Sequence, residues 1–169
     1  KGDCVMKGYW KQEKETAETI IDGWLHTGDI AKIDSEGYIT IIDRKKEIIV
    51  NSGGDNIAPV RPESALTFHS IIQQAMVSGD RRPYLVAIIV PDPELSKKLN
   101  EDELEKNITE AVNEANKNLS QIEKIRKYIV VSEPFSTDNG MFTATMKIRR
   151  HKVREAYGET LDALYKNNQ

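Results

Sequence analysis

The stretch that decides the fold is GWLHTGDIAKIDSEGYITIIDRKKEIIVNSGGDNIAP, which spans residues 23–59. Two β-rich runs within it flank the turn Ser35-Glu36-Gly37, whose glycine can adopt positive φ. The sequence therefore predicts a β-hairpin over residues 30–43. Because a tight turn brings the two ends of a hairpin side by side, we expect Asp29 and Arg44 to be neighbours.

Hydrophobic periodicity and turn residues predict the remaining elements. Expected helices span residues 11–21, 62–68, 101–119 and 147–166, and expected strands span residues 47–50, 71–77, 85–90 and 125–131. Strands and helices do not alternate regularly, so we expect an α+β fold. We place a boundary at residues 43–46. Residues 1–45 then form one region that ends in the hairpin, and residues 46–169 form a small domain with a central sheet of about three strands flanked by helices.

Composition narrows the class of protein. The chain has 169 residues, 38% of them hydrophobic and 30% charged, and it contains no apolar run of the roughly 20 residues that span a bilayer. The net charge of −3 gives no global attraction to nucleic acid, so we expect no nucleic-acid partner. The single cysteine, Cys4, excludes an internal disulfide and fits a reducing cytoplasm. The three histidines share no metal-ligand spacing, so we expect no metal site built from this chain.

Asp29 and Arg44 are candidate ligands for a sugar phosphate. A carboxylate in the Thr27-Gly28-Asp29 turn can accept hydrogen bonds from both hydroxyls of a ribose, and an adjacent glycine allows close approach. A guanidinium at a strand end can reach sugar oxygens or a phosphate. Taken alone, however, each is more simply a turn residue or a solvated charge.

Two further segments allow more than one interpretation. Gly53 and Gly54 could form a plain turn. They could also form a loop whose lack of side chains lets a narrow ligand pass close to the backbone. They do not form a Walker loop, because the Gly-Lys-Ser/Thr ending is absent. Lys147 could be delivered into a neighbouring site to neutralise a reacting phosphate, or could be one charge of a basic helix start.

Taken together, five ordered segments resemble the adenylate-forming superfamily, and most of all its long-chain fatty acyl-CoA synthetases. The segments are VMKGYW (5–10), GWLHTGD (23–29), the run from Gly37 to Glu47, SGGDNIAP (52–59) and TATMK (143–147). The resemblance covers nearly the whole chain. It implies that residues 1–45 are the tail of a large adenylation domain and that residues 46–169 are a mobile C-terminal lid. The chain would then be a fragment of a longer enzyme.

The resemblance also implies roles for single residues. Asp29 would bind the ribose hydroxyls of the nucleotide, and Arg44 would contact the same region. Lys46 would be the hinge, and Lys147 would serve the adenylation step. Gly53 and Gly54 would face the pantetheine arm of coenzyme A in the thioester step.

The implied activity is a fatty acid–CoA ligase that uses ATP, Mg²⁺ and coenzyme A and proceeds through an acyl-adenylate. Fatty acid, ATP and coenzyme A would be its ligands, and the missing N-terminal domain its main partner and the main holder of Mg²⁺. We expect a cytoplasmic enzyme that allows peripheral contact with the inner face of a membrane, and an inactive fragment. The alternatives are an acyl-AMP ligase that loads a carrier protein and a non-catalytic binding module that kept the lid fold.

Overall fold

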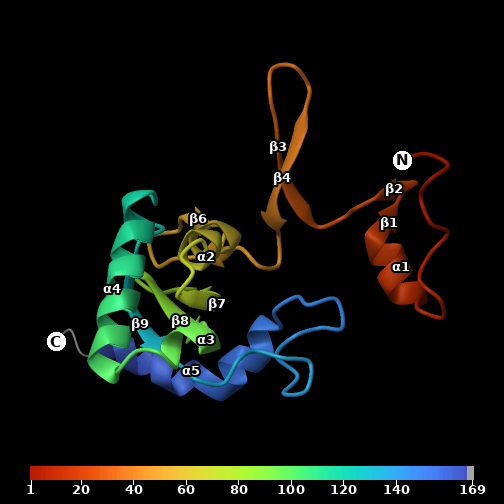
Figure 1. Ribbon diagram of the computed structural model, residues 1–169. Helices are drawn as coiled ribbons and strands as arrows, with labels where there is room; N and C mark the ends of the chain where they lie inside the picture. Colours follow the sequence, from red (N-terminus) through yellow and green to blue (C-terminus); the bar gives the residue numbers. More distant parts are fainter. Residues whose placement is uncertain (167–169) are drawn as a thin grey trace. The chain divides into compact units, whose positions relative to one another are not determined.

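The computed structural model describes residues 1–166 of the chain (Figure 1). It divides into two compact units, Lys1–Lys46 and Glu47–Gln169. The first unit contains, in chain order, α1 (Glu13–Thr19), β1 (Ile20–Ile21), β2 (Trp24–Leu25), β3 (Asp29–Ile33) and β4 (Ile39–Arg44). Among residues 1–166, no helix is both long enough and apolar enough to cross a bilayer.

Helix α1 is shorter than the predicted helix at both ends. Lys11 has a φ of 55°, which lies outside the right-handed helical region, so the helix begins only after Gln12. At the other end, Ile20 and Ile21 form an antiparallel pair with Leu25 and Trp24. The prediction was wrong there because β-branched isoleucines beside a turn favour the extended backbone over another helical turn.

The predicted hairpin is confirmed. Strands β3 and β4 pair antiparallel from Asp29 opposite Arg44 to Ile33 opposite Ile39. The turn between them is held by Asp34, whose Oδ1 accepts hydrogen bonds from the backbone N–H groups of Glu36 and Tyr38, each at 2.9 Å. Gly37 has the positive φ, 89°, that this turn requires.

The second unit is built on a three-stranded sheet in the order β7-β8-β9. Strand β8 pairs antiparallel with β7 on one side and parallel with β9 on the other. In chain order, the elements of the second unit are β5 (Ile49–Val50), β6 (Asn56–Ile57), α2 (Val60–Thr67), β7 (Ile72–Ser78), β8 (Leu85–Pro91), α3 (Pro93–Ser96), α4 (Glu101–Lys117), β9 (Ile125–Val130) and α5 (Arg150–Lys166). The predicted α+β class and the three-stranded sheet flanked by helices are confirmed.

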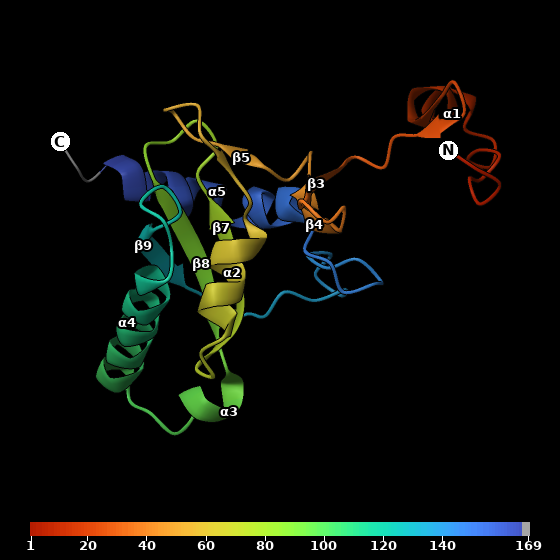
Figure 2. The ribbon, with the colours of Figure 1, turned by 90° about the horizontal axis from the view of Figure 1, so that it is seen from above.

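Both faces of the sheet are covered, and α2 and α4 lie on one face while α5 lies on the other (Figure 2). All seven residues of β8 are buried, because its alternate side chains enter two separate cores. Leu66 of α2 and Ile108 of α4 belong to the first core. Val153 and Leu161 of α5 belong to the second. Burial on both faces makes this unit a rigid support for the loops it carries.

The last helix begins later than predicted. We expected it to start at Lys147, but α5 begins at Arg150. The preceding residues turn back on themselves instead, and Phe142 and Ile148 form an isolated antiparallel bridge. Lys147 therefore lies in a tight loop before the helix, so it is not the first charge of a basic helix.

Candidate functional site

Asp29 and Arg44 are paired at the open end of the β3–β4 hairpin, opposite its turn, as the sequence predicted. Nη1 of Arg44 lies 3.0 Å from Oδ1 of Asp29. The local chain reinforces the pair, because the N–H of Lys45 donates to the carbonyl of Gly28 at 2.7 Å. The Asp29 side chain is one-quarter exposed and that of Arg44 is more than half exposed, so both are accessible to a ligand. A carboxylate has acceptor positions beyond the one that the guanidinium occupies.

Lys46 is the last residue of the first unit, and it is exposed. It lies two residues after the end of β4 in a turn segment, and the short strand β5 starts three residues later. An exposed residue between two separately packed units can change its backbone angles without breaking a core, which suits a hinge.

Gly53 and Gly54 lie in a loop that closes on itself. Oδ1 of Asn51 accepts hydrogen bonds from the N–H groups of Gly53 and Asp55, each at 2.9 Å, and the Asn51 N–H donates to the Asp55 carbonyl. Gly54 has a φ of 86°, and a residue with a side chain would be strained in this conformation. The loop opens on a cavity of about 320 Å³, lined by Gly53 and also by Tyr84, Gln121 and Arg126.

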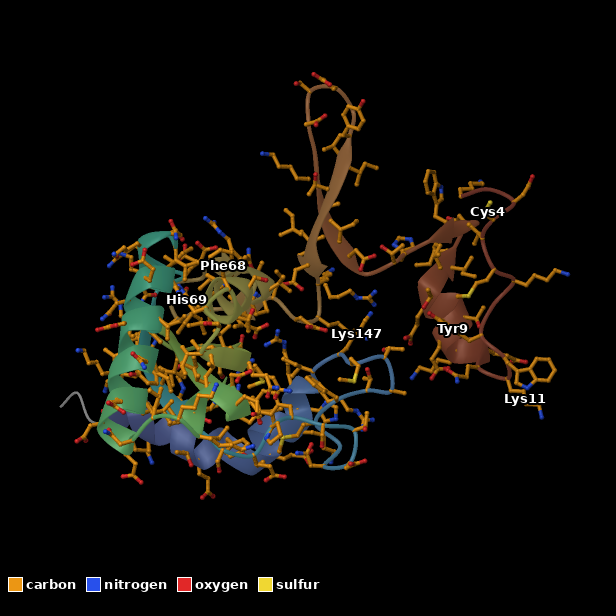
Figure 3. All side chains as sticks on the ribbon, in the orientation of Figure 1. Cys4, Tyr9, Lys11, Phe68, His69 and Lys147 are labelled. Carbon is orange, nitrogen blue, oxygen red and sulfur yellow. The ribbon has the colours of Figure 1, made fainter. Side chains whose placement is uncertain are left out.

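Lys147 is exposed and lies in the tight loop before α5, where Figure 3 labels it. The Thr143 N–H donates to the Lys147 carbonyl at 2.9 Å, and the Lys147 N–H donates to Oγ1 of Thr143 at 3.1 Å. These bonds leave a loop of three residues, and the last of them, Met146, has a φ of 59°. That left-handed conformation normally favours glycine. The lysine is thus presented from a closed, locally strained backbone.

Sequence reasoning missed one cluster, which is centred on Arg150. Its Nη1 and Nη2 atoms donate to the two carboxylate oxygens of Glu63 at 2.6 and 2.8 Å, and its Nε donates to Glu47 at 3.2 Å. Glu63 also accepts from the Val77 N–H at 2.9 Å. Burial disfavours the charged guanidinium, but hydrogen bonds and attraction from Glu63, then from Glu47, outweigh it and raise the pKa of Arg150.

A signal for this cluster was present in the sequence. Arg150 precedes Val153, Tyr157 and Leu161 at helical spacing, which places it on the buried face of α5. Its position inside a run of basic residues hid this signal.

The structure brings Asp29 and Arg44 together within the first unit, whereas Gly53, Gly54 and Lys147 all belong to the second unit. Within the second unit the two loops line different cavities. The glycine loop lines the cavity beside Tyr84, and Met146 lines another, of about 260 Å³, beside α2 and β7. The two loops therefore line two separate parts of the surface of one domain.

Comparison with known proteins shows the family to which the chain belongs. The profile of the AMP-binding enzyme C-terminal domain matches residues 46–169. The chain belongs to the AMP-binding enzymes. It is 38% identical, over 98% of its length, to the long-chain-fatty-acid–CoA ligase FadD15 of Mycobacterium tuberculosis. It is also 34% identical, over 98% of its length, to long chain acyl-CoA synthetase 1 of Arabidopsis thaliana.

Solved AMP-binding enzymes have the same fold. The adenylation domain of a carboxylate reductase from Mycobacterium chelonae superposes with a TM-score of 0.87 at 31% identity, over 95% of this chain and 26% of that one. The A domain of carboxylic acid reductase from Segniliparus rugosus, in complex with AMP and a carboxylic acid, also gives 0.87 at 29% identity, over 100% of this chain and 28% of that one. The chain spans only 30% of FadD15 and 28% of the Arabidopsis relative.

Proposed function

We propose that this chain forms the C-terminal third of a long-chain fatty acid–CoA ligase. The enzyme activates a fatty acid with ATP, forms an acyl-adenylate and releases pyrophosphate. It then transfers the acyl group to the thiol of coenzyme A and releases AMP. The observation that carries this proposal is the Asp29–Arg44 pair, held 3.0 Å apart in a chain 38% identical to a long-chain-fatty-acid–CoA ligase.

In this proposal the Asp29–Arg44 pair binds the nucleotide. The Asp29 carboxylate accepts hydrogen bonds from the two ribose hydroxyls, and Arg44 orients that carboxylate while it donates to sugar or phosphate oxygens. The pairing supports this role because the acceptor and the donor both lie at the end of one hairpin, with their side chains accessible.

Lys147 and the glycine loop serve different half-reactions. Adenylation brings a carboxylate against an anionic α-phosphate, and a lysine aimed at that phosphate stabilises the developing charge. In the thioester step, the loop of Gly53 and Gly54 faces the pantetheine arm instead. A rotation about Lys46 exchanges the two loops, which is the kind of motion a single hinge residue can absorb. Their placement on separate surfaces of one rigid unit supports this exchange.

The apolar surface of the first unit supports the presence of a further domain. Trp10 is 84% exposed and Trp24 is 59% exposed. On the hairpin, the side chains of Ile33 and Ile39 are about two-thirds exposed. A hairpin with apolar side chains in water is marginal by itself, so we propose that residues 1–45 complete a larger adenylation domain that covers them.

We propose that ATP brings Mg²⁺, held mainly by that larger domain. Residues 1–166 contain no group of three or more His, Cys, Asp or Glu side chains placed to hold a metal. In this proposal the chain itself contributes positive charge to the nucleotide site through the side chains of Arg44 and Lys147.

We also propose that the enzyme acts in the cytoplasm, with peripheral contact at the inner face of a membrane. The single cysteine of the chain, Cys4, is exposed, which is compatible with a reducing compartment. Co-sedimentation of the full enzyme with vesicles tests the membrane contact.

The deciding experiment uses the full-length enzyme that contains this chain, with a long-chain fatty acid, ATP, Mg²⁺ and coenzyme A. We expect one AMP and one acyl-CoA per turnover, and ATP–pyrophosphate exchange that depends on the fatty acid. Absence of fatty-acid-dependent exchange would refute the proposal. The 169-residue chain alone is the control, and we expect no exchange from it.

A carrier-protein acceptor is the alternative that a specific observation favours. The A-PCP didomain of the Segniliparus rugosus carboxylic acid reductase superposes with a TM-score of 0.80 at 31% identity, over 98% of this chain and 24% of that one. If the acceptor is a carrier, the enzyme acylates a phosphopantetheinylated carrier protein and excess coenzyme A does not compete. If the acceptor is coenzyme A, acyl-CoA accumulates and no carrier is needed.

A further inference from the structure

Arg150 occupies a position that its own helix disfavours. It is the first residue of α5, and the first turn of that helix has no acidic residue. A cation at a helix N-terminus opposes the helix dipole. The placement of Arg150 is therefore explained by partners outside α5, namely Glu63 on α2 and Glu47. The contact with Glu63 is bidentate, the geometry that fixes a guanidinium in both position and orientation.

The chain between Lys147 and Arg150 is closed by backbone contacts. The Arg149 N–H donates to the Met141 carbonyl at 2.7 Å, and Phe142 bridges Ile148. These contacts leave little freedom between the loop and the start of the helix. Fixing Arg150 therefore fixes the base of the loop that presents Lys147.

One of the two carboxylate partners of Arg150 lies where the domain begins. Glu47 is the first residue of the second unit and follows Lys46 directly. Glu63 extends the connection into α2, and its hydrogen bond from Val77 extends it into β7. The cluster thus joins the segment after the proposed hinge, the central sheet and the Lys147 loop.

We propose that Arg150 is a positioning residue for Lys147, which it aligns for adenylation by bonding the Lys147 loop to Glu63 and Glu47. The inference rests on the proposed function. A turn of the backbone at Lys46 then moves Lys147 together with the whole domain. The glycine loop is held by bonds of its own around Asn51, so the thioester step does not depend on Arg150 in the same way.

The test measures both half-reactions in the full-length enzyme with Arg150→Met, Arg150→Lys and Arg149→Met. Arg149 is the matched control, because it is the adjacent arginine and is exposed, and because within residues 1–166 its guanidinium makes only a long contact, 3.5 Å, with the Gly140 carbonyl. For Arg150→Met we expect the kcat of adenylation to fall by about tenfold to a hundredfold, as a misplaced catalytic group does. Arg150→Lys keeps the charge but loses the bidentate geometry, so its kcat should be intermediate. Thioester formation from a pre-formed acyl-adenylate should stay within about twofold of wild type.

A merely structural role gives a different result. Loss of folded enzyme lowers both half-reactions by the same factor, and that outcome would overturn the proposal. The proposal would also be overturned if the Arg150→Met enzyme catalysed adenylation at the same rate as the Arg149→Met enzyme. Where Arg150→Met folds poorly, Glu47→Gln tests the same connection, because this carboxylate is partly exposed and its loss is milder. It should lower adenylation more than thioester formation.

A second measurement separates this inference from the proposed function. Hydrogen exchange of the Thr143 and Lys147 amides in the 169-residue chain should quicken in Arg150→Met and not in Arg149→Met. If the wild-type enzyme forms no acyl-adenylate, the proposed function fails, and the exchange rates still decide whether Arg150 anchors the loop. Equal exchange in both variants would overturn the anchoring role.

Discussion

Nη1 of Arg44 and Oδ1 of Asp29 lie 3.0 Å apart across the first residue pair of the β3–β4 hairpin. The pair is too exposed to stabilise the fold by more than roughly 0–1 kcal/mol, the usual range for surface ion pairs. In the proposed function the pair binds the nucleotide, so its loss should affect activity much more than stability.

Asp29→Asn tests this pair in the full-length enzyme. The change keeps the shape but removes the charge, and hydrogen bonds to charged groups contribute about 1.5–3 kcal/mol, so we expect the KM for ATP to rise about tenfold or more. Steady-state kinetics at varied ATP measure it. Glu36→Gln, a neutralised carboxylate in the turn of the same hairpin, is the control. An unchanged KM in Asp29→Asn would remove Asp29 from the nucleotide site.

Lys147→Met should impair adenylation selectively. Removing an electrostatic stabiliser of the transition state typically costs about 100-fold or more in rate, and the thioester step has no developing phosphate charge to stabilise in this way. Pyrophosphate exchange and acyl transfer from a synthetic acyl-adenylate measure the two steps. Lys152→Met, at an exposed ion pair on α5, is the control. Equal loss in both steps contradicts the assigned role.

Gly54→Ala should have the opposite selectivity. Gly54 has a φ of 86°, so an alanine there strains the loop by about 1 kcal/mol or more. We expect slower acyl transfer to coenzyme A with adenylation retained. Gly53 lacks this positive φ, although a Cβ there would lie 3.3 Å from Asn51 Oδ1. Gly53→Ala therefore shows the effect of side-chain crowding without the strain of a positive φ. If either variant slowed adenylation more than acyl transfer, the result would contradict a role of this loop in the thioester step.

The backbone conformation of Met146 predicts changes in folding stability that can be measured without an activity assay. Its φ of 59° costs a non-glycine residue about 1–2 kcal/mol. Met146→Gly relieves that cost but adds chain entropy to the unfolded state, so we expect a gain of roughly 0.5 kcal/mol. Met146→Val, whose branched side chain tolerates the conformation less well, should lower stability instead. Urea unfolding of the 169-residue chain measures both, and a Val variant more stable than the Gly variant would contradict the strain.

Tyr165 should make stability depend on pH in the alkaline range. Burial disfavours its charged form and raises the pKa of the hydroxyl above the ordinary value. The single O–H donor of this hydroxyl lies within hydrogen-bond distance of two carbonyls, those of Ser78 at 3.3 Å and Tyr84 at 3.1 Å. The folded state therefore keeps this proton where the unfolded chain loses it. The stabilisation is fully present below about pH 10, the ordinary tyrosine pKa, and declines as pH rises above it.

Tyr165→Phe isolates this contribution. Below pH 10 wild type should be more stable by about 1 kcal/mol, the usual net value of a hydrogen bond, and the difference should shrink above pH 10. Urea unfolding at several pH values measures it. Lysine titration occurs in both proteins and cancels in the comparison. A difference that stays constant from pH 8 to pH 11 would contradict the raised pKa.

Much of the fold could be predicted because it depends on local patterns. The helix α4 followed from apolar side chains at helical spacing, and of these Ile108, Ala111, Val112 and Ala115 are buried. Its N-terminus is fixed by the Asn100–Glu103 capping box. The Asp29–Arg44 contact followed from the hairpin alone, since a tight turn determines which residues face each other.

The rest depended on contacts distant in sequence. The Arg150–Glu63 pair joins residues 87 positions apart, and no local pattern specifies that partner. The start of α5 was misplaced because helix propensity favoured Lys147, whereas the bridge between Phe142 and Ile148 closes the chain into a loop first.

The order of strands has a consequence for how the domain forms during synthesis. Strands β7 and β8 pair across a short turn, so this hairpin can form early, whereas the Tyr165–Ser78 contact must wait for residues 87 positions away. The Lys147 loop lies between β9 and α5 and acquires its anchors only when α5 docks. A chain emerging from the ribosome therefore forms its central hairpin first and anchors the Lys147 loop last.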